Sequence, residues 1–281
     1  MSTQAPILFL VFNRYDTTIQ IFETIKKERP KKLYISADGP RDGIDDDLKK
    51  CTEVRNIFEM IDWDCEVFTL FQDNNLGPYK SQITGINWFF EHEKEGIILE
   101  DDALPDKTFY MFCYSLLDKY RHDHRVSMIS GCNFQQQNKH GNADYYFTKH
   151  TNTYGCAMWK RSWNHMDFNL VDWPDFLSSG GMDDFSNSSG VRRSFKEDFG
   201  NLYLDPEKAG WDYLFMFSSL KNGAVSIAPN VNLIKNIGFG PGASHTIFTE
   251  SPHAMLETFN INLPLKHPSI ISRNLIADEF E

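Results

Sequence analysis

The sequence predicts an α/β fold built on a mostly parallel central sheet. Five short apolar runs recur along residues 1–131, segments with helical spacing separate them, and turn residues interrupt the chain between them. The chain has 281 residues, of which 41% are hydrophobic, so it can bury a substantial core. We expect a single domain over residues 1–281, with a less regular second half at 132–281.

Each element of the first half follows from its residues. Strands are expected at the apolar runs Pro6–Phe12, Leu33–Ala37, Cys65–Phe71, Gly96–Leu99 and Val126–Ser130. Helices are expected between them at Asp16–Glu28, Asp46–Ile61, Tyr79–Glu91 and Asp106–Tyr120, with Asp16 as a helix cap. Because strands and helices alternate, the strands should run parallel and end at one edge of the sheet.

The second half should contain fewer regular elements. A helix is predicted at Trp211–Leu220, and short strands are predicted within residues 224–249. Residues 178–200 are rich in Gly, Ser and Asp, and we expect them to form a mobile loop or lid.

The fourth predicted strand ends in three consecutive carboxylates, Glu100, Asp101 and Asp102. Open α/β sheets bind ligands at the carboxyl ends of their strands, and desolvation there increases the repulsion between adjacent carboxylates. A divalent cation would relieve this repulsion, and the hard oxygen ligands suit Mg²⁺ or Mn²⁺. From the spacing alone, a metal site and a solvated acidic loop both stay open.

Other candidate residues follow the remaining strand ends. Arg14 can pair with phosphate or form a surface salt bridge. Asp38 can accept a hydrogen bond from a base N–H, as uracil offers, or form an Asp-Gly turn. Lys80 can meet a diphosphate near a helix start or stand exposed on that helix.

Two candidates lie in the second half. Asp212 falls in an apolar helical stretch, where an unpaired carboxylate is costly, and it can act as general base for a hydroxyl. A helix cap and a buried salt bridge are its alternatives. His245 follows a glycine turn and can reach a metal or a diphosphate, or lie on the surface.

The composition limits the possible binding partners of the protein and its possible cellular compartment. The net charge is -11 and no Lys/Arg-rich run is present, which argues against nucleic acid as a partner. Five cysteines without a CxxC spacing argue against zinc and disulfides and indicate reduced thiols. With no signal peptide and no apolar run of about 20 residues, we expect a cytoplasmic protein that can contact a membrane only peripherally.

Taken together, the sequence resembles glycosyltransferases of the GT-A fold, close in pattern to the N-acetylglucosaminyltransferase I group and its bacterial relatives. The segments that carry the resemblance are PILFLVFNR, SADGP, NNLGPYKS, IILEDDALP, YGCAMWKRSW and GWDYLF. The resemblance implies a Rossmann-like fold, with a nucleotide-binding half at 1–131 and an acceptor-side half with a C-terminal extension at 132–281.

The resemblance also implies a role for six of the eight candidate residues. It makes Asp102 a metal ligand, Glu100 and Asp101 donor contacts, and Asp212 the general base. Arg14 and Asp38 would hold the nucleotide. The implied reaction is an inverting transfer of a sugar from a nucleotide-diphosphate donor, most simply a UDP-sugar, to a hydroxyl of a glycan or lipid-linked acceptor, with Mn²⁺ or Mg²⁺.

Three other functions are alternatives. A sugar-phosphate nucleotidyltransferase shares the α/β core but needs a glycine-rich first loop, where this chain has Phe-Asn-Arg-Tyr. A metal phosphohydrolase would be expected to carry Asp-x-Asp after its first strand. A non-catalytic nucleotide-sugar-binding protein of the same fold is compatible with the sequence.

Overall fold

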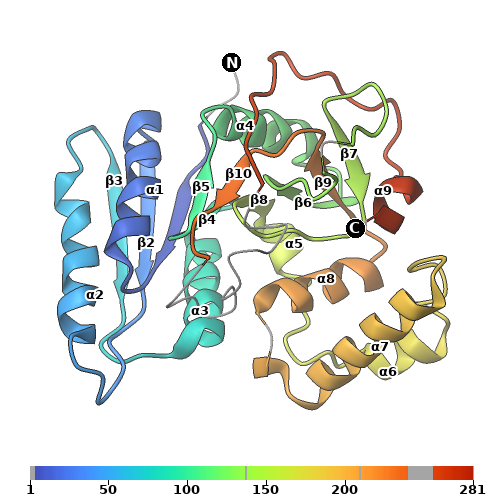
Figure 1. The fold of residues 1–281 in the computed structure, drawn as a ribbon, viewed down its shortest axis with the longest axis horizontal. Coiled ribbons are helices and arrows are strands. Elements are labelled where there is room, and N and C mark those ends of the chain that lie inside the picture. The colour runs from blue at the N-terminus through green and yellow to red at the C-terminus, as the bar shows by residue number, and fades with distance from the viewer. Residues whose placement is uncertain (1–3, 137, 209, 240–255, 281) are drawn as a thin grey trace.

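An eight-stranded sheet is the central feature of the computed structural model, which describes residues 4–136, 138–208, 210–239 and 256–280 (Figure 1). The strands are β1 (Ile7–Val11), β2 (Lys32–Ala37), β3 (Glu66–Phe71), β4 (Glu95–Glu100), β6 (Val126–Ser130), β7 (Tyr145–Thr148), β8 (Cys156–Trp159) and β9 (Val225–Pro229). Their order is β3-β2-β1-β4-β8-β6-β9-β7, and only β8 and β7 run antiparallel to the strands beside them. This arrangement confirms the predicted α/β class with a mostly parallel sheet, and it is consistent with a Rossmann-like GT-A fold.

The helices of the first half lie between the predicted strands. They are α1 (Tyr15–Glu28), α2 (Asp47–Asn56), the 3₁₀ helix η1 (Ile57–Met60), α3 (Gly77–His92) and α4 (Phe109–Tyr120). The expected cap at Asp16 was wrong, because α1 begins at Tyr15 and Arg14 holds the N-cap position without a side-chain cap. Helix α4 begins three residues later than predicted, because Asp106 Oδ1 accepts hydrogen bonds from Thr108 and forms a turn before the helix.

The second half is more helical than predicted. Its helices are α5 (Lys160–Trp163), α6 (Trp173–Ser178), α7 (Ser189–Leu204), η2 (Pro206–Lys208), α8 (Trp211–Lys221) and α9 (Leu275–Phe280). The expectation of a loop over residues 178–200 was therefore wrong for its second part. Helix α7 is capped by Ser188, whose Oγ accepts a hydrogen bond from the Val191 backbone N–H, and it buries Phe199 and Leu202.

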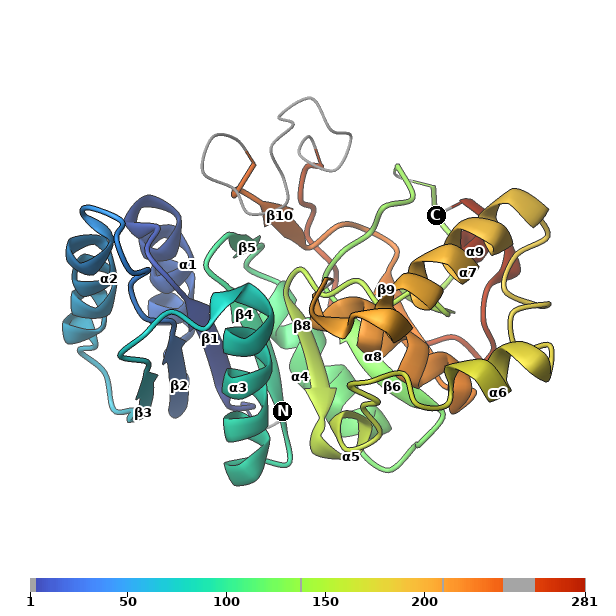
Figure 2. The same ribbon diagram turned by 90° about the horizontal axis from the view of Figure 1, so that it is seen from below.

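Helices cover both faces of the sheet, as the two views show (Figures 1 and 2). Side chains of α1, α2 and α4 share one hydrophobic cluster with one face of β1, β2 and β4. The other face packs against α3, α5 and α8. A separate cluster joins α6, α7 and α8, so the helices of the second half have a core of their own.

A small two-stranded antiparallel sheet extends beyond β4. It pairs β5 (Ala103–Pro105) with β10 (Ile234–Asn236), and the backbone N–H of Ile237 donates to the carbonyl of Asp102 at 2.8 Å. The chain after β10 is therefore held against the end of the acidic triplet.

All five cysteines are free thiols. Within the part of the chain that the structure describes, no helix is both long enough and apolar enough to cross a bilayer.

Candidate functional site

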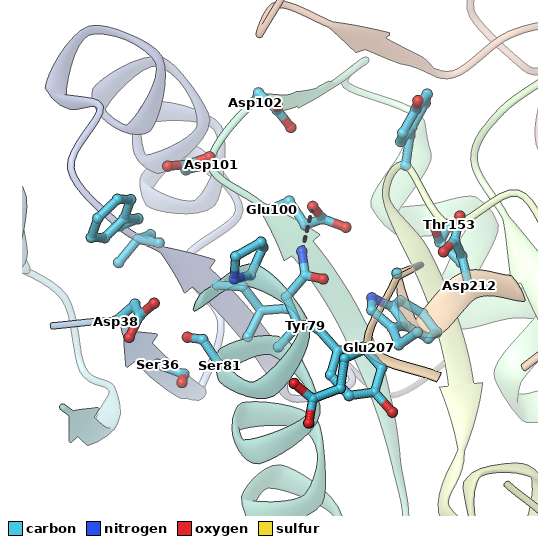
Figure 3. A pocket seen from close by; sticks show the side chains of 18 of the residues that line it. Ser36, Asp38, Tyr79, Ser81, Glu100, Asp101, Asp102, Thr153, Glu207 and Asp212 are labelled. Carbon is cyan, nitrogen blue, oxygen red and sulfur yellow. Dashed lines mark hydrogen bonds between the residues drawn. The ribbon is translucent and has the colours of Figure 1, made fainter. Parts of the chain in front are cut away.

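A cavity of about 980 Å³ lies at the carboxyl ends of β1, β2 and β4. Its opposite wall comes from α7, η2 and the first turn of α8. In Figure 3, Asp38 lies on one side of the cavity, Asp212 on the other, and Glu100 between them. Six of the eight predicted site residues line it: Arg14, Asp38, Glu100, Asp101, Asp102 and Asp212.

The acidic triplet is paired with a guanidinium. The Nη2 of Arg14 donates to Asp101 Oδ1 and, at 2.9 Å, to Asp102 Oδ2, while its Nε donates to Asp101 Oδ2 at 3.4 Å. The sequence led us to expect that a divalent cation relieves the repulsion within the triplet. Arg14 supplies part of that compensation, and its salt bridges lie at the pocket rather than on an open surface.

Burial and like charge act together on the triplet. Burial, followed by the negative charges of Asp102, Asp101 and Asp212, raises the pKa of Glu100 well above its ordinary value, and Arg14 opposes this. Burial also raises the pKa of Asp101 to about 6, with Arg14 opposing and Asp102 adding to the effect. The influence of Asp212 on Glu100 shows that the two walls of the pocket interact electrostatically.

This electrostatic conflict predicts that a neutral side chain at position 100 stabilises the fold. We expect Glu100→Gln to raise Tm at pH 7 by about 2–4 °C, which corresponds to about 1 kcal/mol for a chain of this size. Because the folded-state pKa is raised, the ionised group destabilises the fold only above the unfolded pKa of about 4. The gain should therefore vanish as the pH falls below about 4.

Thermal unfolding of the wild type and the variant between pH 3 and pH 8 measures this difference. Glu91→Gln, which changes an exposed glutamate on α3, is the matched control and should leave Tm unchanged at every pH. Equal Tm values for wild type and Glu100→Gln at pH 7 would contradict the prediction.

Asp38 joins the end of β2 to the loop before α3. Its Oδ1 accepts from the backbone N–H groups of Gly39 at 2.8 Å and Leu76 at 2.9 Å, and its Oδ2 accepts from Asn75 Nδ2 at 3.0 Å. Burial raises its pKa, and these backbone N–H groups oppose the increase. Asp38 thus has the turn-forming role that the sequence allowed, and it also lines the pocket.

Asp212 lies in the first turn of α8, directly after the buried Trp211. Trp211 packs edge-on against Trp163 and Phe215, with ring centroids 5.7 Å and 6.1 Å away, and so fixes the start of the helix. Gly210 holds the N-cap position, so Asp212 is not the helix cap. Its half-buried carboxylate lines the pocket across from the triplet (Figure 3).

One described candidate, Lys80, is not among the residues that line the pocket. Lys80 is 55% exposed on α3 and forms an ion pair with Glu207 at 2.9 Å. His245 lies outside the described residues. Both assignments stay predictions.

Several pocket residues were not identified from the sequence. Gln82 donates to Glu100 Oε2 at 3.0 Å, and Asn13 and Arg41 line the end of the pocket beside β1 and β2. Gly238 packs so closely that a Cβ atom there would meet Asp102 Oδ2 and lie 2.8 Å from Arg14 Nη1. The glycines near residue 238 were a visible signal, but their place beside Asp102 depends on the pairing of β10 with β5.

The carboxylates of the pocket suit a cation that is coordinated partly by the phosphates of a bound substrate. Among the described residues, no three His, Cys, Asp or Glu side chains form a group that could enclose a metal ion. Mg²⁺ commonly binds through one or two carboxylates together with substrate phosphates. Asp102, at the edge of the pocket, fits this mode of binding.

Comparisons with known proteins give fold-level likenesses. No family model matches the chain, and neither does any curated protein. One similar solved structure is the mannosyltransferase PcManGT from Pyrobaculum calidifontis in complex with GDP-Man and Mn²⁺, with 12% identity and a TM-score of 0.40. The match covers 58% of this chain and 46% of that chain, so this protein spans less than half of the mannosyltransferase.

HddC from Yersinia pseudotuberculosis is also similar, with 7% identity, a TM-score of 0.34, and coverage of 56% of this chain and 78% of that chain. Neither likeness identifies a reaction, which must be inferred from the pocket itself. The resemblance to the N-acetylglucosaminyltransferase I group stays a prediction.

Proposed function

We propose that the protein is a metal-dependent, inverting glycosyltransferase that uses a nucleotide-diphosphate sugar, most simply a UDP-sugar, and a hydroxyl acceptor. One observation carries the proposal: a single cavity has Arg14, Asp38 and the acidic triplet on one wall and Asp212 on the other. A donor bound between these walls would have its nucleotide at the strand ends and its sugar facing Asp212.

The charges of the pocket support a cation-assisted mode of donor binding. Among its described lining residues, seven carboxylates (Asp38, Glu100, Asp101, Asp102, Asp198, Glu207 and Asp212) outnumber three cations (Arg14, Arg41 and Lys208). This excess of negative charge would repel a diphosphate. Asp102 would hold a divalent cation, which would supply the charge neutralisation that the leaving nucleotide requires.

The chain's own residues account for the rest of the proposed reaction. Asp212 accepts the proton of the acceptor hydroxyl as that oxygen attacks the anomeric carbon. The new bond joins the acceptor oxygen to this carbon, and the bond from the same carbon to the diphosphate oxygen breaks. The diphosphate leaves with the bonding electrons. Arg14, which lies beside the triplet, would pair with the leaving diphosphate.

The proposal is tested by incubating the protein with Mn²⁺ and a panel of UDP-, GDP- and CMP-sugars and measuring nucleotide release. Slow release of UDP from a UDP-sugar supports it. A parallel assay with nucleoside triphosphates and sugar 1-phosphates measures pyrophosphate, whose appearance would identify a nucleotidyltransferase instead. Nucleotide-sugar binding without turnover in either assay would indicate a non-catalytic binding protein.

The choice of UDP depends on Asp38, whose carboxylate can accept from the N–H of uracil. A preference for GDP or CMP in the same panel would remove that role. A glycan or lipid-linked acceptor and a cytoplasmic location, with peripheral membrane contact, remain predictions from the sequence.

A further inference from the structure

Asp47, the first residue of α2, accepts hydrogen bonds from two side chains that line the pocket. Its side chain is 1% exposed. Its Oδ2 accepts from Arg41 Nε at 2.7 Å, and its Oδ1 accepts from Arg41 Nη2 at 2.9 Å and from Asn13 Nδ2 at 2.6 Å. Arg41 and Asn13 line the pocket, whereas Asp47 is not among its lining residues.

The hydrogen bonds of Asp47 are directed to the pocket rather than to its own helix. Asp46 holds the N-cap position of α2 without a side-chain cap, and the Asp47 carboxylate accepts instead from Arg41 and Asn13 and from the Arg41 backbone N–H at 3.0 Å. The hydrogen bonds with Arg41 hold the pKa of Asp47 well below its usual range, so the carboxylate is ionised at neutral pH.

The groups that Asp47 orients surround one end of the pocket. The guanidinium of Arg41 is half exposed and lies 5.5 Å from the centroid of the Phe12 ring, at the end of β1. Asn13 lies two residues after the end of β1, and this end of the pocket lies on the β2 side of the triplet, away from Asp212. An aromatic ring, a planar cation and an amide suit a nucleoside, whose base is planar and whose ribose carries hydroxyl groups.

We propose that Asp47 is a positioning residue that aims Arg41 and Asn13 at the nucleoside part of the donor. This inference rests on the proposed function and adds a specific binding end to it. The carboxylate fixes Arg41 through two of its nitrogens, so the guanidinium meets the ligand already oriented, and less side-chain freedom is lost on binding.

The test is calorimetric titration of UDP in the presence of Mn²⁺. We expect Asp47→Asn to weaken UDP binding about tenfold, because the amide removes the ion pair with Arg41 and leaves one oxygen, instead of two, to accept hydrogen bonds. Arg41→Ala should weaken binding by a similar factor, and the double variant should be no weaker than either single variant. Asp45→Asn, an exposed aspartate of the same loop, is the matched control and should bind like wild type.

The outcomes separate this inference from the proposed function. If Asp47→Asn lowers Tm but binds UDP as wild type does, Asp47 is only structural and the inference fails alone. Independent, multiplying losses in the double variant would also overturn it, because Asp47 would not act through Arg41. If wild type binds none of UDP, GDP and CDP, both the proposed function and this inference are wrong.

Discussion

Replacing Asp212 with asparagine is expected to lower kcat by about 10²–10⁴-fold, the range that a general base contributes. An acceptor hydroxyl is a poor nucleophile while it keeps its proton, and the amide of asparagine cannot take that proton. In the proposed complex the nucleotide lies at the opposite wall, so its Kd should change by less than about twofold. Asp212→Asn should therefore lower the transfer rate while leaving the donor Kd nearly unchanged.

A matched variant controls for the loss of one negative charge at a helix start. Asp175 is an exposed aspartate in the first turn of α6, and Asp175→Asn should leave both kcat and donor Kd unchanged. Normal turnover by Asp212→Asn would exclude the general-base role. A large loss of donor affinity would instead place Asp212 in donor binding.

The second large effect is expected at Asp102. We expect Asp102→Asn to abolish the Mn²⁺-dependent part of nucleotide binding, so that UDP binds equally weakly with and without the metal. The change also removes one of the two anionic partners of Arg14 Nη2, which leaves Asp101 as the only carboxylate paired with that nitrogen. Titration of UDP into the variant, with Mn²⁺ and with EDTA, measures this effect without any need for turnover.

Asp118→Asn is the control for this experiment. Asp118 is exposed on α4 and paired with Arg121 at 2.9 Å, remote from the pocket lining. It should keep the full metal effect. If Asp102→Asn retains the same ratio of affinities with and without Mn²⁺ as wild type, Asp102 is not the metal ligand.

The fold of the first half could be predicted because its signal is local. Each strand is a short apolar run bounded by turn residues, and the alternation with helices determines the direction of the strands. Helix α7 was missed for a local reason as well. Its Gly and Ser residues favour a loop, and its helical character depends on burying Phe199 and Leu202 against α6 and α8.

The site was predictable as a set of strand ends but not as a set of contacts. Placing Arg14, Asp38 and the triplet at one edge required only the order of strands. The ion pairs of Arg14 join residues 87 and 88 positions apart, and no spacing in the sequence indicates them. The sequence could not distinguish Asp47 from the neighbouring aspartates. In the structure Asp47 is buried, whereas Asp45 and Asp46 are exposed.

The α7 part of the pocket wall is anchored in the cluster among α6, α7 and α8, whereas Trp211, beside Asp212, packs with the sheet. Mutations can therefore accumulate in the helical cluster without disturbing the strand ends. For the proposed enzyme this separation means that a lineage could exchange the molecule being glycosylated while keeping its activated sugar. Grafting residues 164–208 between homologous chains would be the corresponding route for engineering.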